Sequence, residues 1–241
     1  MTYVMSDLHG AYGRYMSMLE KIKFSGADVL YILGDVVDYG PEPMKLLHDM
    51  SMRANVIPIM GNHDFVTLDI LRQLPAVVSP DSLKRRFGKD LAEFTEYMEE
   101  WFRIGGKPTL DSFMRESGGG RKHILQYLSG FYGYKVITVT SKTYVLSHAG
   151  IPSQPRNKKL ASYRLDNWGK FDWLQAGVDY GRQYFTDAFL VTGHLPTSNI
   201  SESSRGKIYC SFGHIAIDTG SAFGEAMGCL CLDTGEEFYV S

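Results

Sequence analysis

Five apolar runs in this chain end in side chains that can bind a metal ion or move a proton. The residues delivered at these ends are Asp7, His9, Asp35, Asp38, Asn62, His63, Asp64, His148 and His194. A buried charge is costly unless it is paired or binds a metal. Carboxylate, amide and imidazole donors without thiolate suit manganese, iron or zinc. Together the runs predict a metal-dependent site, although each short motif alone is weak evidence.

The elements that must position these residues are short strands. The runs "YVM", "VLYIL" and "VIPIM" (Tyr3–Met5, Val29–Leu33 and Val56–Met60) predict buried strands, and helical patterns separate them. This alternation favours βαβ units with parallel strands. Ligands of open α/β sheets bind beyond the carboxyl ends of the strands, so we expect the polar side chains to converge on one crevice.

Residues from about 68 to 130 show helical periodicity in place of strand patterns. We expect a mainly helical insert here, divided by loops at "GGKP" and "SGGGRK". Strand patterns then return, and the last four, from "KIYCSF" to "EEFYV", favour antiparallel pairing. The predicted fold class is α/β: a two-sheet α/β/β/α sandwich with a helical insert, in a single domain over residues 1–241.

The composition excludes several kinds of partner. The 241 residues have a net charge of −2, which gives no reason to expect nucleic acid or an anionic membrane as a partner. No apolar stretch approaches the roughly 20 residues of a membrane helix, and the first residues lack the features of a signal peptide. Three cysteines suit a reducing compartment. We expect a cytoplasmic protein, and the oligomeric state stays open.

Five motifs carry a family resemblance: Asp-x-His from Asp7, Gly-Asp-x-Val-Asp-x-Gly from Gly34, Gly-Asn-His-Asp from Gly61, His-Ala-Gly from His148 and Gly-His from Gly193. This set resembles the calcineurin-like metallophosphoesterases. Within this superfamily it resembles the bacterial phosphoprotein phosphatase branch, which includes the symmetrical diadenosine tetraphosphate hydrolases. "GGKPTLDSF" and "IAIDTGSAFG" are also similar to that branch, so the resemblance spans nearly the whole chain.

The resemblance implies a site with two divalent metal ions. Asp7, His9 and Asp35 would hold one ion, and Asp35 would bridge to the second. The other ligands of the second ion would be Asn62, His148 and His194. Manganese is the expected metal, with iron or zinc as alternatives. A hydroxide shared by two ions about 3.5–4 Å apart would attack the phosphoryl group in line.

The same resemblance implies that His63 protonates the leaving oxygen. It also implies that Asp38 fixes the tautomer of the His63 ring and raises the basicity of that ring. An alternative for Asp38 is a cap for the helix that opens near Pro41. Asp64 is a candidate to support Asn62 from outside the metal shell.

Two positions depart from the branch. Tyr39 stands where an arginine is usual, and Gln175, in "FDWLQAG", stands where a second arginine is expected. Such arginines grip the substrate phosphate as a fork. The candidates for substrate binding in their place are Tyr39 and Arg14, with Arg156, Arg164 and Arg182 as further sources of positive charge.

These observations predict a metal-dependent phosphomonoesterase, with phosphoserine or phosphothreonine in proteins as one substrate. One alternative keeps the chemistry and acts on a dinucleoside polyphosphate or another small nucleotide. Another is a weakly catalytic module that recognises phosphate, but such a module has no chemical need of the His63–Asp38 pair. A nuclease is disfavoured because the chain has no basic stripe.

Overall fold

The computed structural model describes residues 1–152 and 156–241. Its strands form two five-stranded mixed sheets: sheet A, in the order β10-β9-β1-β2-β3, and sheet B, in the order β4-β5-β6-β8-β7. The strands are β1 (Thr2–Met5), β2 (Val29–Leu33), β3 (Val56–Ile59), β4 (Tyr134–Val139), β5 (Lys142–Ser147), β6 (Phe189–Thr192), β7 (Tyr209–Ser211), β8 (His214–Ala216), β9 (Met227–Cys231) and β10 (Glu237–Val240). The helices are α1 (Tyr12–Lys21), α2 (Pro43–Ser51), α3 (Asn62–Gln73), α4 (Pro80–Phe87), α5 (Leu91–Arg103), α6 (Lys107–Arg115), α7 (Gly118–Ser129), α8 (Lys170–Leu174) and α9 (Thr197–Ile200).

Parallel strands form one part of each sheet, as the alternating pattern predicts. β2 pairs parallel with β1 and β3 in sheet A, and β6 pairs parallel with β5 and β8 in sheet B. The last four strands pair antiparallel, β7 with β8 and β9 with β10. The two hairpins belong to different sheets, because β9 pairs with β1.

The two sheets pack face to face, which confirms the predicted sandwich. Val4 and Leu33 of sheet A share a buried cluster with Leu146 and Val191 of sheet B. The next residue after Val4, Met5, belongs to a second cluster with the helices. Because successive side chains of a strand point to opposite faces, sheet A supplies both clusters.

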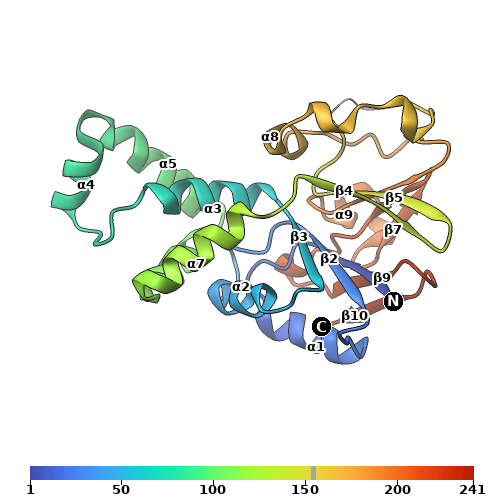
Figure 1. Cartoon of the computed structure of the whole chain (residues 1–241), viewed down its shortest axis with the longest axis horizontal. Coiled ribbons are helices and arrows are strands. Elements are labelled where there is room, and N and C mark those ends of the chain that lie inside the picture. Colours follow the sequence, from blue (N-terminus) through green and yellow to red (C-terminus); the bar gives the residue numbers. More distant parts are fainter. Residues whose placement is uncertain (153–155) are drawn as a thin grey trace.

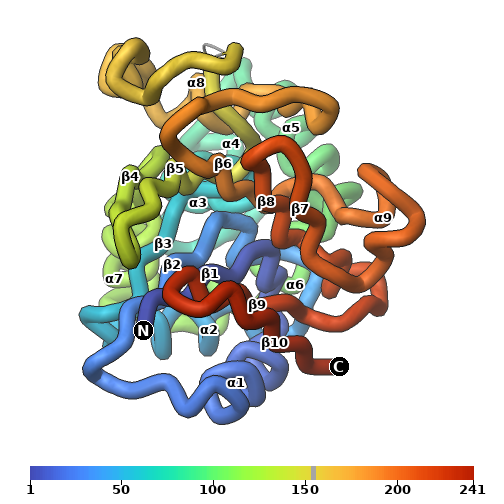
Figure 2. The backbone as a smooth tube through the Cα atoms, turned by 90° about the vertical axis from the view of Figure 1, so that its right-hand side faces the viewer, coloured from blue at the N-terminus to red at the C-terminus, as the bar shows by residue number. Residues whose placement is uncertain are grey.

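The outer layers differ in kind. Helices α1 and α2 cover the outer face of sheet A, and α8 lies beyond sheet B (Figure 2). On that side Val145 and Leu190 pack against Trp173 of α8 and against Tyr184 and Phe185. The last two residues lie in an irregular segment, so the described part of the outer layer over sheet B consists of short helical turns and loops.

Helices α3 to α7 lie between β3 and β4, and α4 and α5 project to the left of Figure 1, away from both sheets. The prediction of a loop at "SGGGRK" is wrong, because the three glycines of this segment are the first residues of α7. Ser117 caps this helix by accepting the backbone N–H of Gly120 (3.1 Å), and Ile124 and Leu128 are buried. Capping and packing outweigh the low helix propensity of glycine. None of the described helices has the length and apolar character needed to cross a membrane.

Candidate active site

The polar residues found in the sequence follow the carboxyl ends of parallel strands. β1, β2 and β3 end shortly before Asp7, Asp35 and Asn62, and β5 and β6 end shortly before His148 and His194. The two sheets pack face to face. The residues that follow the strands of sheet A and those that follow the strands of sheet B therefore lie at the same edge of the sandwich. The predicted convergence is therefore observed.

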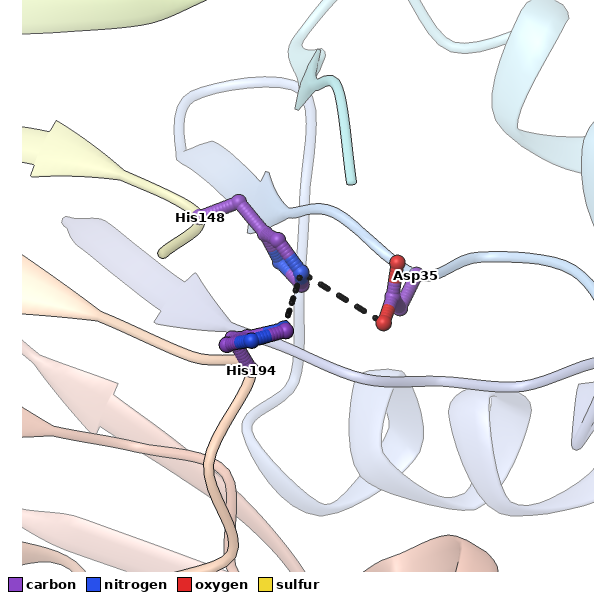
Figure 3. Close-up of side chains that lie close together, drawn as sticks. All are labelled: Asp35, His148 and His194. Atoms are coloured by element: carbon purple, nitrogen blue, oxygen red, sulfur yellow. Dashed lines mark hydrogen bonds and ion pairs between the residues drawn. The ribbon is translucent and has the colours of Figure 1, made fainter. Parts of the chain in front are cut away.

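Two groups of possible metal ligands lie at this edge. Asp7, His9 and Asp35 form one group, and Asp35, His148 and His194 form the other; within each group the ligand atoms lie within 4.8 Å of one another. Figure 3 shows His148 between Asp35 and His194: its Nε2 is 3.4 Å from Oδ2 of Asp35 and 3.2 Å from Nδ1 of His194. Asp35 is common to both groups, as a bridging ligand must be.

Asn62, the first residue of α3, completes the second group. Its Oδ1 lies 2.9 Å from Nε2 of His148. Polar atoms of an amide, a carboxylate and two imidazoles thus lie close together beside β2.

The tautomers of two histidines fit metal binding. Nδ1 of His9 lies 3.0 Å from the carbonyl of Val37, and Nδ1 of His148 lies 2.7 Å from that of Leu33. A carbonyl only accepts, so each Nδ1 carries hydrogen, and each Nε2 is the ring atom that can give its lone pair to a metal once it carries no proton. Both Nε2 atoms face Oδ2 of Asp35, at 4.0 Å from His9 and 3.4 Å from His148. The two histidines thus present Nε2 to the carboxylate that both groups of possible ligands share.

The electrostatics of the site also favour cations. Burial opposes a charged His148, but the carboxylate of Asp35 outweighs burial and raises the pKa of His148 to about 10. Burial, and next the carboxylate of Asp218, raise the pKa of Asp7 well above its usual range. Both shifts mean that the cluster gains stability from added positive charge. A divalent ion would supply that charge in place of a proton.

Strained backbone is concentrated at the same strand ends. Six residues here have φ in the left-handed region, which residues other than glycine rarely adopt. They are Asp7 (52°), His9 (43°), Asp35 (52°), Asp38 (70°), Tyr39 (60°) and His194 (69°). Such conformations persist where the surrounding structure over-determines them, and they cluster at active sites. The backbone is therefore independent support for a functional site.

Two glycines allow the segments of the site to approach closely. A Cβ atom added at Gly61 would lie 2.1 Å from Oδ1 of Asp35. One added at Gly193 would lie 1.7 Å from Oγ of Ser6 and 2.3 Å from Oδ2 of Asp7. Packing around the carboxylates of Asp7 and Asp35 therefore leaves no room for a side chain at either position.

His63 and Asp38 lie as a proton donor and its partner are expected to lie. Nδ1 of His63 is 2.8 Å from Oδ2 of Asp38, and the rings of His63 and His9 are 5.0 Å apart. Burial disfavours the imidazolium, but the hydrogen bond to Asp38 and the charges of Asp35 and Asp38 outweigh it and raise the pKa of His63. The geometry thus places a proton-carrying group next to the possible ligand His9.

Three partners of Asp38, whose side chain is fully buried, could not be predicted from the sequence. Oδ1 accepts hydrogen bonds from the hydroxyls of Thr67 (3.2 Å) and Thr109 (2.7 Å), and Oδ2 accepts one from the indole of Trp101 (3.0 Å). These partners lie on α3, α6 and α5, and only Thr109 stands in a quoted motif, "GGKPTLDSF". The alternative role of Asp38 as a helix cap is wrong, since α2 begins only at Pro43.

A cavity of about 450 Å³ opens beside the possible ligands Asn62 and His194. Gln175 lines it, at the position where the family resemblance implies an arginine. Lysine and arginine are absent from the described residues that line this cavity. Arg164, a candidate replacement, lines a different cavity with Tyr134. A phosphate in the cavity beside Asn62 would therefore meet no arginine fork from these walls.

The side chains of two other candidate arginines, Arg14 and Arg182, have protein partners. Nη1 of Arg14 donates to the backbone carbonyls of Ser221 (2.8 Å) and Glu225 (3.1 Å), so Arg14 anchors the loop that carries them. Substrate contact by Arg14 stays a prediction. Nε of Arg182 lies 3.8 Å from Oδ2 of Asp179.

Two further aspartates support the site. Asp64 accepts the backbone N–H groups of Val36 (2.9 Å) and Gly61 (3.0 Å), so it ties together the loops after β2 and β3. Asp218 follows β8, is buried, and accepts the N–H of Gly220 (2.9 Å). Asp218 is not among the predicted site residues, although "IAIDTG" has the same form as the other runs, an apolar strand ending in aspartate.

Comparison with known proteins identifies the family. A family model described as calcineurin-like phosphoesterase matches residues 2–218, so the chain belongs to this family. Calcineurin-like phosphoesterases are metal-dependent hydrolases of phosphate esters. The class inferred from the motifs and from the two groups of ligands is thereby confirmed.

Relatives named symmetrical bis(5'-nucleosyl)-tetraphosphatase are similar along this chain. One from Pseudomonas fluorescens (strain SBW25) is 28% identical, over 98% of this chain and 93% of its own length. One from Buchnera aphidicola subsp. Baizongia pistaciae (strain Bp) is 38% identical over 65 residues, which are 26% of this chain and 23% of that protein.

Solved structures share the fold at low identity. A protein serine/threonine phosphatase from Saccharomyces cerevisiae has a TM-score of 0.54 at 14% identity, covering 100% of this chain and 80% of its own. A cold-active protein-tyrosine phosphatase of a Shewanella species has a TM-score of 0.52 at 16% identity, with the same coverage of 100% and 80%. These likenesses concern the fold alone.

Proposed function

We propose that this phosphoesterase holds two divalent ions and uses His63 as the proton donor to the leaving oxygen. The ligands of the first ion are Asp7, His9 and Asp35, and those of the second are Asp35, Asn62, His148 and His194. The observation that carries the proposal is the position of Asp35, which belongs to both groups of ligand atoms. Manganese is the metal we expect, with iron or zinc as alternatives.

The ions, when bound, would polarise the phosphoryl group and activate a water molecule. The chain's own residues then have separate tasks. Asp7 and Asp35 offset part of the metal charge, which leaves a net positive site that attracts phosphate although the protein is slightly acidic. The backbone carbonyls of Val37 and Leu33 orient the rings of the ligand histidines.

His63 supplies a proton to the leaving oxygen, and Asp38 orients it. The bond from Nδ1 to Asp38 leaves Nε2 of His63 to face the substrate. The raised pKa of His63 keeps the acid form populated near neutral pH. Protonation matters most when the leaving group is a poor one, such as the alcohol of serine.

Two substrate classes follow. The first is a phosphomonoester, including phosphoserine or phosphothreonine in proteins. The second is a dinucleoside polyphosphate, which is favoured by the similarity of a tetraphosphatase along 98% of this chain. A net charge of −2 and free cysteines accord with a cytoplasmic enzyme that does not bind nucleic acid.

A turnover screen with added Mn²⁺ tests the proposal. The substrates are p-nitrophenyl phosphate, a phosphoserine peptide, diadenosine tetraphosphate and a cyclic nucleotide. We expect turnover of at least one ester, and its loss in Asp35→Asn. The substrate with the highest kcat/KM then identifies the class. Tight phosphate binding without turnover of any substrate would support a recognition module and contradict the enzyme.

A further inference from the structure

Two exposed aromatic side chains meet beside His63. Tyr39 and Phe223 are 39% and 65% exposed, and their ring centroids are 5.8 Å apart at 66°. The Tyr39 ring also lies 5.4 Å from that of His63 and 5.0 Å from that of His9. Single exposed apolar residues are common on protein surfaces, but a contacting pair at the edge of a reaction site suggests a binding surface.

The chain holds Tyr39 in place. Its backbone N–H donates to the carbonyl of Gly105 (2.9 Å), and its φ of 60° is one of the strained values of the site. A Cβ atom added at Gly105 would lie 2.7 Å from the Tyr39 ring. The ring therefore has a closely defined position.

The backbone segment that carries Phe223 is held by its own hydrogen bonds. It ends the short helix η5 (Ser221–Phe223). Arg14 donates to the carbonyl of Ser221, and Oγ of Ser221 donates to the carbonyl of Asp7 (3.1 Å). The loop that carries Phe223 is thus tied to the backbone of a possible metal ligand.

We propose that the Tyr39–Phe223 pair binds a flat aromatic ring of the leaving group, an aryl ring or a purine. This inference rests on the proposed function, because a donor to the leaving oxygen must lie beside the group that departs. Tyr39 touches His63, so that group emerges against the exposed aromatic surface. Tyrosine and phenylalanine recognise a neutral flat ring by stacking and edge contacts. The position that usually carries an arginine for phosphate would then select the leaving group.

The test compares substrates with and without an aromatic leaving group. kcat/KM is measured for 2-naphthyl phosphate, diadenosine tetraphosphate and glycerol 1-phosphate with wild type and Phe223→Ala. We expect a loss of about ten-fold for a ring-bearing substrate and a change of less than about two-fold for glycerol 1-phosphate, because stacking on one aromatic side chain contributes roughly that much. Each ratio compares two proteins on one substrate, so the intrinsic reactivity of the ester cancels.

Further variants separate stacking from general damage. Tyr39→Phe should retain the preference for ring-bearing esters, whereas Tyr39→Leu should lose it. Phe212→Ala, which removes another exposed phenylalanine (57% exposed), is the matched control and should change no ratio. Inhibition by inorganic phosphate should stay near the wild-type value in Phe223→Ala, since phosphate has no ring.

The outcomes are distinguishable. If Phe223→Ala lowers kcat/KM for 2-naphthyl phosphate alone, aryl esters are the substrate class. If it lowers kcat/KM for diadenosine tetraphosphate alone, purine nucleotides are the class. The inference is overturned if Phe223→Ala lowers kcat/KM equally for glycerol 1-phosphate and the ring-bearing esters, or lowers it for none of them. The phosphoesterase proposal stands in either case. If wild type with Mn²⁺ hydrolyses none of the three, the proposed function itself fails.

Discussion

The indole Nε1 of Trp101 donates a hydrogen bond to Oδ2 of Asp38 at 3.0 Å, although 63 positions separate the two residues. The same oxygen lies 2.8 Å from Nδ1 of His63. Thr109 holds the other oxygen of Asp38 at 2.7 Å. The helical segment between β3 and β4 therefore supplies three donors that position the Asp38 carboxylate, since Thr67 of α3 also donates to it.

Trp101→Phe should lower kcat by about 3- to 10-fold for esters with poor leaving groups. Hydrogen bonds to a charged group are worth roughly 1.5–3 kcal/mol, and without this one the Asp38 carboxylate bonds more strongly to the Nδ1 proton of His63. The alkaline limb of the pH–kcat profile should therefore shift to higher pH. Trp168→Phe, at a residue that is 40% exposed, is the control and should leave the profile unchanged. A merely structural Trp101 would reduce thermal stability without moving the profile.

His63→Asn should lower kcat by about 10²–10⁴-fold while the metal content stays near that of wild type. The loss should be smaller for p-nitrophenyl phosphate than for an alkyl phosphate, because a good leaving group hardly needs protonation. Asp38→Asn should show a milder loss with the same dependence. Steady-state kinetics on both esters, with metal analysis of each variant, make the comparison. Equal losses on the two esters are incompatible with His63 as the acid.

The positions of the possible metal ligands could be predicted because their signal is local. An apolar run followed by Asp7, Asp35 or His148 is a strand and its carboxyl end, and parallel strands bring such ends together. Asp218 has the same signal at the end of β8 and could have been found in this way.

The partners of the predicted residues could not be found in this way. Trp101 reaches Asp38 only because α5 packs near the end of β2, and apolar periodicity in α5 explains its burial without indicating a hydrogen bond. Phe223 meets Tyr39 across 184 positions of sequence. The glycines that open α7 show a related limit, since capping by Ser117 and burial of Ile124 outweigh local propensity.

Purified protein expressed with ample metal should contain close to two transition-metal ions per chain. Asp35→Asn should lose more metal than Asn62→Ala, because only Asp35 lies in both groups of ligand atoms. Elemental analysis after removal of free metal measures the content. Asp81→Asn, on the exposed first turn of α4, is the control. One ion or none in wild type would rule out the dinuclear site.

Gly193→Ala should reduce metal content and stability together. Its Cβ would lie 1.7 Å from Oγ of Ser6 and 2.3 Å from Oδ2 of Asp7, so the Asp7 carboxylate must move. We expect destabilisation by about 1–3 kcal/mol, as is usual for overpacking. Gly13→Ala is the matched control: nothing lies within 4 Å of its added Cβ, and the residue is in α1. That change should stabilise the protein by about 0.5–1 kcal/mol. Urea unfolding and metal analysis of both variants provide the test, and full metal content in Gly193→Ala would contradict the close approach.

The last prediction concerns His214, a buried histidine outside the ligand groups. Its Nε2 lies 2.8 Å from Oγ1 of Thr192, and its ring is stacked on Tyr180 at 4.9 Å. Burial lowers the pKa of His214 to about 4, whereas an unfolded chain has an ordinary value of about 6.5. Between these values the unfolded state binds the proton first. The contribution of His214 to stability is therefore complete above about pH 6.5 and is lost as the pH falls toward 4, by about 3 kcal/mol in all.

His214→Gln isolates this contribution, because glutamine can bond to Thr192 but does not titrate. The free energy of unfolding in urea is measured for both proteins from pH 4 to pH 7. Wild type should lose stability more steeply than the variant below pH 6.5, by up to about 1.4 kcal/mol per pH unit for one proton. Burial raises the pKa of Asp218 to about 6, which acts in the opposite direction, but Asp218 is present in both proteins and cancels in the difference. Parallel curves for the two proteins would mean that His214 takes up its proton without leaving the folded state, and that the packing of Tyr180 admits an imidazolium.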